Sequence, residues 1–490
     1  MQLITQLIRI DSSSATAIYL QVTNLFIQHI HQGRFRKGLK LPGSRALAGL
    51  LKINRRTAVA AYQELEAQGW IETKLRHGTF VKVDPPLLLP QRIKNDSTTF
   101  TLPTRPIFRY DETKVLPFYS DDFPPAGKLV LNDGSPDIRL APIEDLVKSI
   151  RSLSRISANK KYLMYGGAQG THFLRETLAE FLNDTRGLSI TPDNILITKG
   201  AQMGIYITSW ILLQSRSDVI VGSPGYRGAH RTFQQLGAKV HFTPVDNDGL
   251  DIDVVEKICK KRTVSLVYVI PHHHYPTTAT LTPERRIRLL DLAARYKFAI
   301  IEDDYDYDFH YDSKPMMPMA SLDRNGSVVY IGTLTKSLAP AIRFGFIVAP
   351  SAFIRTATHL RKAIDSQGDS LIENAIADLY KGGVISRHIK KSLKIYRERR
   401  DHFCDLLHHE LGNHVAFKVP EGGMSVWTKF TDQKLPAVAE RAFQKGLLIR
   451  SGIEFDTEKV KYNSTGLGFA SLNFKEQERG IEILRAVLKA

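Results

Sequence analysis

Apolar side chains recur at helical spacing near the start of the chain. A first helix is predicted where one face carries Ile18, Val22, Leu25, Phe26 and Ile30. A second, short helix is expected from Ser44 and a third from Asn54 to Gly69, because serine and asparagine are favourable N-cap residues. The strings WIET and GTFVKV then predict two short strands around a basic turn.

Strands that alternate with helix-like segments fill most of the remaining chain. The run Phe298 to Ile301 predicts a buried parallel strand, and the acidic string EDDYDYDF follows it. The string ITKGAQMGI, from Ile197, predicts a short strand and then a helix that starts near Ala201. Ligand-binding groups in an open α/β sheet follow the carboxyl ends of strands, so we expect a site there.

A proline-rich stretch separates these two patterns. Residues 84–115 contain five prolines among polar residues, which favours a partly extended linker. A chain of 490 residues is long enough for more than one domain. We therefore predict a first domain at 1–83, a linker at 84–115 and a second domain at 116–490.

Charge and cysteine content narrow the cellular setting. The formal net charge of +17 suits a polyanionic partner. Cys259 and Cys404 have no zinc-type spacing, which favours a reducing cytoplasm without disulfides. No apolar stretch approaches the length of a membrane span, so we expect neither insertion nor secretion.

The first domain concentrates basic side chains. Residues 1–83 hold twelve Lys or Arg against four Asp or Glu, a net of +8. Arg55, Arg56 and Thr57 occupy the first helical turn after Asn54, the part of a recognition helix that meets base edges. A solvated basic face is the alternative interpretation, but clustering on one helix turn and one wing favours DNA. Further contacts are expected from Arg45, Lys74, Arg76 and Gly78.

The string GTLTKSLAPAIRFG contains the reactive candidate, Lys336. A covalently bound pyridoxal phosphate needs a lysine amine on a short loop. A buried carboxylate such as Asp303 keeps the cofactor's ring nitrogen protonated. The flanking Thr333, Thr335 and Arg343 can hold the phosphate, and a guanidinium does so through two parallel hydrogen bonds. Taken alone, an acidic strand end is equally typical of a solvated loop or a metal site.

The order of the motifs resolves this ambiguity. YGGAQGTHFLRETLAEFL (from Tyr165), ITKGAQMGI and GSPGYRG (from Gly222) precede the acidic and lysine motifs. This order resembles the fold-type-I, class I/II aminotransferases across residues 116–490. The resemblance implies an α/β domain with a mostly parallel central sheet, pyridoxal phosphate as cofactor, and a homodimer.

Carried over residue by residue, the resemblance assigns roles around the cofactor. Lys336 becomes the Schiff-base lysine, Asp303 the partner of the ring nitrogen and Tyr305 the donor to the ring hydroxyl. Tyr226 becomes the aromatic residue that stacks on the ring. The phosphate is then held by Ala201, Gln202, Thr333, Thr335, Arg343 and, from the other subunit, Tyr165.

The first domain resembles the GntR-type winged helix-turn-helix, through LPGSRALA, NRRTAVAAYQELEAQGW and GTFV. Joined to an aminotransferase-like domain, it resembles the MocR/GabR-type transcription regulators over the whole chain. Such relatives respond to an amine, an amino acid or pyridoxal phosphate itself. The resemblance implies a regulator that binds a double-stranded DNA operator.

Three departures from the family pattern bear on the effector. PHHHYPTTATLTPERR resembles a Pro-x-His-Gln-aromatic-Pro-Thr-Gly block, with His274 for the glutamine and Thr278 for the glycine. We expect His273 or His274 near the cofactor and no metal, because neighbours on an extended segment point opposite ways. In NSTGLGFASL, Gly466 replaces an arginine that usually binds the substrate's α-carboxylate, and Arg450 is a candidate substitute.

Three functions follow from these observations. The favoured one is a pyridoxal-phosphate-dependent transcription regulator that senses a ligand and has little or no turnover. The alternatives are an active aminotransferase with an appended head, and a DNA-binding protein whose second domain is only a dimerisation scaffold. Absorbance of bound cofactor separates the last from the others, and turnover separates the first two.

Overall fold

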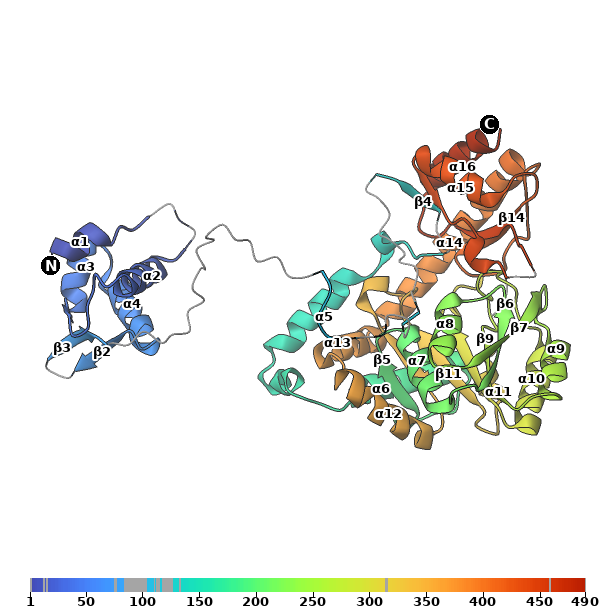
Figure 1. The fold of residues 1–490 in the computed structure, drawn as a ribbon, viewed down its shortest axis with the longest axis horizontal. Helices are drawn as coiled ribbons and strands as arrows, with labels where there is room; N and C mark the ends of the chain where they lie inside the picture. Colours follow the sequence, from blue (N-terminus) through green and yellow to red (C-terminus); the bar gives the residue numbers. More distant parts are fainter. Residues whose placement is uncertain are drawn as a thin grey trace. The chain divides into compact units, whose positions relative to one another are not determined.

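The computed structural model divides into two compact units, residues 1–109 and 110–490, drawn in Figure 1 and coloured along the sequence. It describes residues 2–11, 14, 16–74, 77–82, 104–109, 111, 115–116, 127–131, 134–312, 316–457 and 460–489. Most of the predicted linker, and Arg76 of the predicted wing, lie outside the described residues. Among the helices described, none combines the length and apolar character needed to cross a bilayer.

The first unit packs four helices against a three-stranded sheet of order β1-β3-β2. Its elements are α1 (Gln2–Leu7), α2 (Ile18–His31), β1 (Lys40–Leu41), α3 (Ser44–Leu51), α4 (Arg55–Ala67), β2 (Ile71–Lys74) and β3 (Gly78–Val81). β3 pairs antiparallel with both neighbours. A single core buries Val22, Phe26, Leu47, Leu65 and Trp70. The predicted helices and hairpin therefore form one winged helix-turn-helix.

The start of α4 agrees with the prediction, whereas its end, at Ala67, falls two residues before the predicted Gly69, and the start of α3 differs. The Asn54 side chain caps α4 and accepts a 2.9 Å hydrogen bond from the Arg56 N–H. Ser44 is instead the first residue inside α3, Gly43 takes the N-cap position, and no side chain caps this helix. α1 was not predicted, because one buried pair, Ile4 and Ile8, is too short a pattern to establish a period.

The second unit is built on an eight-stranded sheet of order β5-β12-β11-β10-β9-β6-β7-β8. Its strands are β5 (Ile195–Thr198), β6 (Asp218–Ser223), β7 (Lys239–Asp246), β8 (Gly249–Leu250), β9 (Val264–Val269), β10 (Ala299–Asp304), β11 (Val328–Thr333) and β12 (Gly345–Val348). β7, β6, β9, β10 and β11 are parallel, and β12 runs antiparallel between β11 and β5. The expected mostly parallel sheet is confirmed.

Helices cover both faces of this sheet. They are α5 (Ile143–Arg155), α6 (His172–Arg186), α7 (Ala201–Leu212), α8 (Arg227–Gln235), α9 (Ile252–Cys259), α10 (Pro283–Tyr296), α11 (Met319–Leu322), α12 (Ser351–Asp365) and α13 (Ser370–Lys381). Along β6, Val219 and Val221 join a core cluster with α7, α8 and α12, whereas Ile220 joins another with α9 and α10. The alternation follows because successive strand side chains point to opposite faces.

A smaller antiparallel sheet of order β13-β14-β16 follows in the same unit. Its strands are β13 (Val415–Phe417), β14 (Ser425–Phe430) and β16 (Ser464–Gly468), packed with α14 (Val384–Leu411), α15 (Leu435–Gln444) and α16 (Phe474–Leu488). β4 (Leu129–Leu131) and β15 (Leu447–Ile449) form a parallel pair. Short 3-10 turns are η2 (Ile138–Leu140), η3 (Ser157–Leu163), η4 (Pro192–Asn194), η5 (Pro340–Ile342) and η6 (Ile453–Phe455).

Candidate functional site

The predicted cofactor residues come from one edge of the large sheet. β12 is antiparallel to both β5 and β11, so β5 points the same way as β6, β9, β10 and β11. The carboxyl ends of these strands therefore lie along one edge. Asp303 is the last residue but one of β10, Lys336 follows β11, and Tyr226 follows β6. Topology thus brings together residues that are more than a hundred positions apart in the sequence.

Asp303 is buried, and only one of its two carboxylate oxygens accepts a hydrogen bond. Its Oδ2 accepts a 2.6 Å hydrogen bond from the Tyr268 hydroxyl of β9, and its Oδ1 has no partner. Burial raises the pKa of Asp303 to about 7, and the Tyr268 bond opposes this rise. A buried acceptor without a donor is costly, so this oxygen suits an N–H brought by a ligand.

The residues on both sides of Asp303 in β10 are also buried acids. Burial raises the pKa of Glu302 to about 8, although its oxygens accept from Met319 N and Ala320 N at 2.7 and 2.8 Å. Burial raises the pKa of Asp304 to about 6, and its Oδ2 accepts from the Tyr330 hydroxyl at 2.6 Å. The protein supplies donors for both oxygens of Glu302, whereas Asp304, like Asp303, keeps its Oδ1 without a hydrogen-bond partner. The family resemblance therefore assigns the ligand contact to Asp303, and its hydrogen bonding is compatible with that role.

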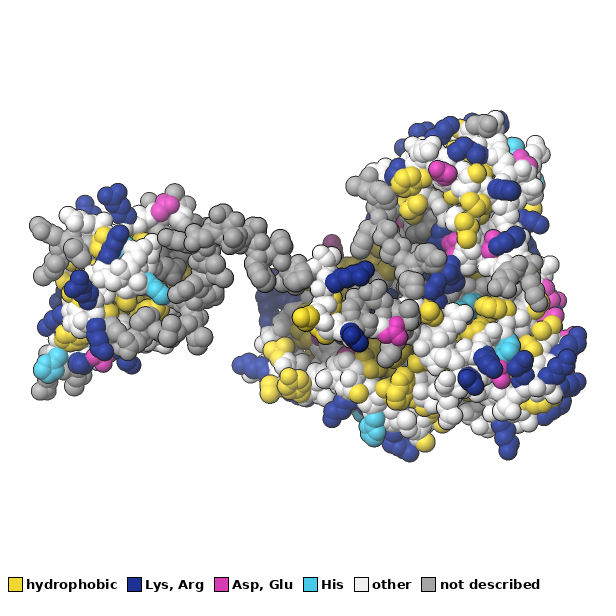
Figure 2. Space-filling model, in the orientation of Figure 1, with side chains coloured by type: hydrophobic (Ala, Val, Ile, Leu, Met, Phe, Trp, Pro, Cys, Tyr) yellow, Lys and Arg dark blue, Asp and Glu magenta, His cyan; other side chains and the backbone are white. Residues whose placement is uncertain are grey.

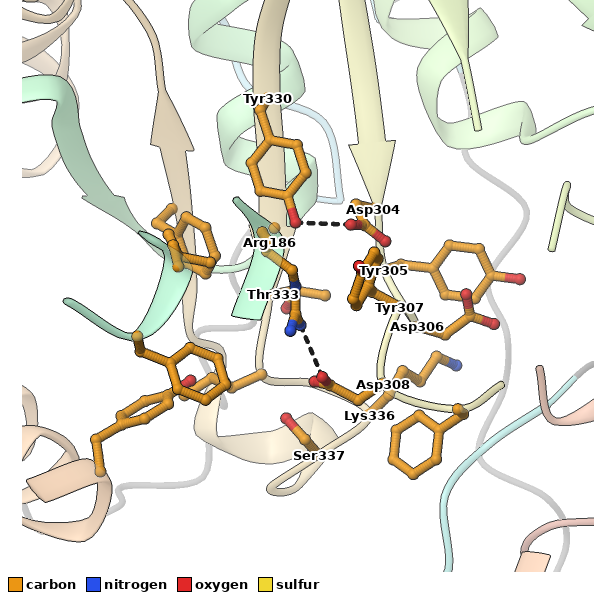
Figure 3. Close-up of a pocket in the computed structure, with 17 residues that line it drawn as sticks. Arg186, Asp304, Tyr305, Asp306, Tyr307, Asp308, Tyr330, Thr333, Lys336 and Ser337 are labelled. Atoms are coloured by element: carbon orange, nitrogen blue, oxygen red, sulfur yellow. Dashed lines mark hydrogen bonds and ion pairs between the residues drawn. The ribbon is translucent and has the colours of Figure 1, made fainter. Parts of the chain in front are cut away.

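Lys336 lies in the loop after β11, beside Tyr305. Its Nζ donates a 2.5 Å hydrogen bond to the Gly134 carbonyl and lies 5.8 Å from the centre of the Tyr305 ring. The Tyr305 hydroxyl donates to the His273 carbonyl at 3.0 Å. Figure 3 shows Lys336 extending among the acidic and tyrosine side chains that follow β10.

A hollow beside Lys336 contains residues that sequence reasoning missed. Arg186, at the end of α6, pairs with Asp308 at 2.8 Å and lies 3.9 Å above the centre of the Tyr307 ring. The dashed lines in Figure 3 mark this pair and the bond from Tyr330 to Asp304. Arg186 gave no signal, because an arginine in the last turn of a helix is an ordinary feature. Tyr268, a lone tyrosine in the aliphatic string SLVYVI, was a detectable signal.

The predicted phosphate-binding residues divide into two groups. Ala201 and Gln202 open α7, and the Arg343 Nη2 donates a 3.3 Å bond to the Lys199 carbonyl just before that helix. Gly200, between them, has φ +82°, and a Cβ there would lie 2.7 Å from Arg343 Nη2. This cradle combines a helix N-terminus with a guanidinium, which favours an anion. Arg343 and Gln202 also line a second hollow together.

Thr333 and Thr335, by contrast, stabilise the loop itself. The Thr333 hydroxyl donates to the Phe344 carbonyl at 2.7 Å. The two threonine hydroxyl oxygens are also 2.7 Å apart, so the Thr335 hydroxyl donates to Thr333. Both hydroxyl protons are thereby used within the loop. Their role as phosphate ligands stays a prediction.

Tyr226 and Tyr165 occupy different environments. The Tyr226 hydroxyl donates to Gln202 Oε1 at 3.0 Å, which fixes its ring next to the first turn of α7. Tyr165 is 93% exposed within the single chain. The exposure leaves its side chain available to a second subunit, as the family resemblance implies.

The histidines after β9 make their hydrogen bonds within the protein. His273 Nδ1 lies 3.0 Å from Asp306 Oδ1, and its Nε2 lies 3.1 Å from His310 Nδ1. His274 Nε2 lies 2.9 Å from the Pro224 carbonyl, and burial lowers the pKa of His274 to about 4. Both imidazoles are buried and bonded within the protein, and their contact with an effector stays a prediction.

Two further departures from the family pattern have visible consequences. Thr278, in place of the family's glycine, adopts φ +59°, a left-handed conformation that is strained for a β-branched residue. Gly466, where the family resemblance predicts a carboxylate-binding arginine, lies opposite Trp427 in the pairing of β14 with β16. The Arg450 guanidinium, the candidate substitute, is 3.6 Å from Glu454 Oε1.

The predicted DNA-binding residues lie on the surface of the first unit. Arg45, Arg55 and Arg56 are exposed, and Thr57 is half-buried beside them. Lys74 is exposed on β2 and pairs with Glu72 at 2.9 Å. Gly78 has φ +105°, and a Cβ there would lie 2.9 Å from Lys40 Cε. Figure 2 shows Lys and Arg side chains over the visible face of this unit.

The residues at the sheet edge fit the group that the resemblance implies. An unpartnered buried carboxylate oxygen on Asp303 meets the need of a protonated ring nitrogen. The α7 N-terminus with Arg343 meets the need of a phosphate. Lys336, in the loop after β11 at the same sheet edge, offers the amine. For a metal, no group of three ligating side chains occurs among the described residues.

Two family models match the chain. The model described as aminotransferase class I and II matches residues 127–460. The model described as bacterial regulatory proteins, gntR family, matches residues 18–81.

Relatives align over nearly the full length of the chain. The HTH-type transcriptional regulator YdfD of Bacillus subtilis is 28% identical over 96% of both chains. The probable rhizopine catabolism regulatory protein MocR of Rhizobium meliloti is 25% identical over 98% of this chain and 96% of its own. The structure of Pyrococcus horikoshii kynurenine aminotransferase in complex with PMP covers 74% of this chain and 91% of its own, with a TM-score of 0.69 and 28% identity.

Proposed function

The chain belongs to the class I and II aminotransferase family and carries a gntR-type DNA-binding domain, and from this premise we propose that its second unit senses pyridoxal phosphate or a small amine and thereby controls DNA binding. Relatives that align over the whole chain are transcriptional regulators, and members of the aminotransferase family bind pyridoxal phosphate. The protein is thus a pyridoxal-phosphate-dependent DNA-binding regulator. The effector and its coupling to DNA are the proposed part.

The unpartnered Oδ1 of Asp303 is the observation that carries the sensing proposal. When bound, the cofactor supplies an aldehyde that reacts with amines and a ring that withdraws electrons. Asp303 would accept the ring N–H, Lys336 would bind the aldehyde, and Arg343 with the α7 N-terminus would hold the phosphate. Because each contact exists only with the ligand, occupancy can shift the unit between two states.

We also propose a homodimer. Tyr165 is 93% exposed, and Ile156, Leu163 and Met164 on the same segment are 50%, 70% and 67% exposed. Contiguous exposed apolar side chains favour a protein partner. A second copy would cover this surface and bring Tyr165 to its cofactor phosphate. A symmetric dimer also matches the symmetry of operators that helix-turn-helix proteins bind.

An aminotransferase with an appended head is the second candidate. The retained Lys336 and Asp303 favour it, since they are the groups that the chemistry needs. Gly466 opposes it, because transamination requires the substrate carboxylate to be held in a fixed orientation. We therefore propose slow turnover or none with ordinary α-amino acids.

A spectroscopic and DNA-binding experiment tests the proposal. Wild-type protein incubated with pyridoxal phosphate should gain a visible absorbance band, and Lys336→Ala should lack it while remaining folded. Lys381→Ala, an exposed lysine of α13, is the matched control and should keep the band. Genomic fragments selected by the wild type should then be bound with different affinity in the presence and absence of cofactor.

Each competing function has its own outcome in this experiment. Wild-type protein that stays colourless with excess cofactor would contradict cofactor sensing. DNA affinity that ignores both cofactor and amines would leave only the scaffold. Rapid conversion of the bound cofactor to its amine form by common amino acids would identify an active aminotransferase.

A further inference from the structure

Four aromatic rings form a continuous run from the cofactor edge to the smaller sheet. Tyr226, after β6, meets Tyr275, after β9, with ring centres 5.9 Å apart and planes at 90°. Tyr275 meets Phe455 of η6 at 5.9 Å, and Phe455 meets Trp427 of β14 at 5.2 Å and 87°. Edge-to-face contacts at these separations are favourable. The run therefore links the large sheet's ligand edge to β14.

The exposure of these rings indicates that they form one wall of an open surface and are not part of a closed core. Phe455 is 4% exposed and lies behind the others. Tyr226, Tyr275 and Trp427 are only half-buried, so part of each ring is open within the single chain. Tyr226 is also fixed by its bond to Gln202 at the start of α7. Tyr226 and Tyr275 follow β6 and β9 at the same sheet edge as the Lys336 loop, so the run begins at the edge where a ligand of Lys336 would lie.

At Trp427, the end of the run farthest from Tyr226, the residue paired on the neighbouring strand is uncharged. Trp427 and Gly466 are directly opposite in the antiparallel β14 and β16 pair, so both face the same side of the sheet. Gly466 adds no side chain to that face. The indole of Trp427 therefore dominates the position where the family resemblance would put a guanidinium.

Two cations, Arg450 after β15 and Lys429 on β14, have other environments. The Arg450 guanidinium is 3.6 Å from Glu454 Oε1, so a ligand carboxylate would compete with that pair. Lys429, two residues beyond Trp427 on the same face, is exposed to solvent. At the Trp427 end of the run, the residues that the structure describes offer no unengaged, fixed countercharge, so a carboxylate bound there would lose water without compensation, which is unfavourable.

We propose that the effector of this protein is a primary amine with an aromatic or similarly apolar body and no α-carboxylate. The proposal rests on the proposed sensing function. The ligand nitrogen would replace Lys336 Nζ on the cofactor's aldehyde carbon. One C=N bond forms as the other breaks, and the proton that the incoming amine loses passes to Nζ. The ligand body would pack against Tyr275 and Trp427.

A matched pair of ligands isolates the carboxylate. Phenethylamine and phenylalanine differ only in that group, and methylamine lacks the aromatic body. We expect cofactor-loaded protein to bind phenethylamine at least about tenfold more tightly than either of the others, since an unpaired buried charge or a lost apolar contact each costs that much. The readouts are the shift of the visible band during titration and the rise in melting temperature.

Variants at the far end of the run test the wall directly. Trp427→Ala should weaken phenethylamine about tenfold and leave methylamine unchanged. Gly466→Arg should raise the affinity for phenylalanine and reverse the preference. Lys429→Ala is the matched cation control and should not change the ratio of the two aromatic ligands. Arg450→Ala tests the candidate carboxylate residue directly, and the inference expects no change in that ratio either.

The outcomes separate this inference from the proposed function. Wild-type protein that binds phenylalanine as tightly as phenethylamine, or methylamine as tightly as phenethylamine, would overturn the inference. So would a loss of phenylalanine binding in Arg450→Ala or Lys429→Ala, which would reveal a carboxylate site. A visible band that no amine shifts also overturns it but leaves cofactor binding intact, whereas absence of the band refutes both. If Gly466→Arg does not fold, the wild-type ligand series and Trp427→Ala still decide.

Discussion

The hydroxyl of Tyr268 donates a 2.6 Å hydrogen bond to Asp303 Oδ2 and leaves Asp303 Oδ1 buried without a partner. Burial and this hydrogen bond act in opposite directions on the pKa of Asp303. Burial raises the pKa of Asp303 to about 7, while the Tyr268 bond favours the charged form. The acid is therefore poised to change its protonation state when a ring N–H arrives.

Cofactor affinity should depend on pH. Only the ionised Asp303 forms a charge-assisted bond with a ring N–H, so affinity should rise as pH increases through about 7. Tyr268→Phe removes the bond that lowers this pKa, so the midpoint should move to higher pH. Titration of the visible band with pyridoxal phosphate at a series of pH values measures both midpoints. Equal midpoints in the two proteins would show that Tyr268 does not tune the acid.

The cofactor-free protein should be stabilised by Asp303→Asn at high pH. The pKa of Asp303 is raised in the folded state from 3.8 to about 7. Its stabilising contribution is therefore complete below the unfolded value and is lost as pH rises through the folded one. Asparagine carries no such penalty, so the variant should gain on the order of 2–4 kcal/mol above pH about 7, with the gain vanishing near pH about 4.

Urea unfolding of the second unit without cofactor measures this gain. The stability of the variant will still depend on pH, because burial also raises the pKa of Glu302 and Asp304. The same variant should bind pyridoxal phosphate poorly. A variant that is less stable than wild type at alkaline pH would contradict the assigned cost of ionising Asp303.

Gly422→Ala should destabilise the contact between the smaller sheet and the cofactor edge. A Cβ at Gly422 would overlap His273 Nε2 and lie 2.5 Å from the Phe309 carbonyl oxygen. His273 is held by Asp306 and His310, and a backbone oxygen cannot move aside cheaply. We expect a loss of about 1–3 kcal/mol, the usual cost of overpacking. Gly167→Ala is the matched control, since nothing lies within 4 Å of a Cβ there.

Thermal unfolding of the second unit compares these two glycine variants. Gly167→Ala should leave the melting temperature almost unchanged. If Gly422→Ala is equally silent, the segment before β14 is loosely packed and His273 does not position it.

The exposed arginines of the first unit should separate into two classes. Arg55→Ala and Arg56→Ala, at the start of α4, should reduce discrimination between operator and random DNA by about 1–3 kcal/mol. Arg45→Ala and Lys74→Ala should weaken binding to all DNA sequences alike. They should also reduce the salt dependence of binding, because fewer counterions are released when a phosphate contact is lost. Binding at several salt concentrations measures both effects. Undiminished specificity in both α4 variants would place base recognition elsewhere.

Local features of this protein were determined by its sequence. The side chain of Asn54 caps α4 and so fixes where that helix starts. The apolar run from Phe298 leads into the buried strand β10, because a continuous apolar run is typical of a parallel strand that is covered on both faces. The fold class and the cofactor were predictable from the order of the motifs around Asp303 and Lys336. Each of these signals lies within one element or in a linear order that the chain itself preserves.

Only the tertiary structure decided which atoms meet. Tyr268 selects one oxygen of Asp303 because β9 pairs with β10, and Trp427 faces Gly466 because β14 pairs with β16. His273 contacts Asp306 and His310, which lie more than thirty positions later in the sequence, because the chain folds back over it. Periodicity reports only the face of an element. Contacts between residues tens of positions apart depend on strand order and register, which no local pattern encodes.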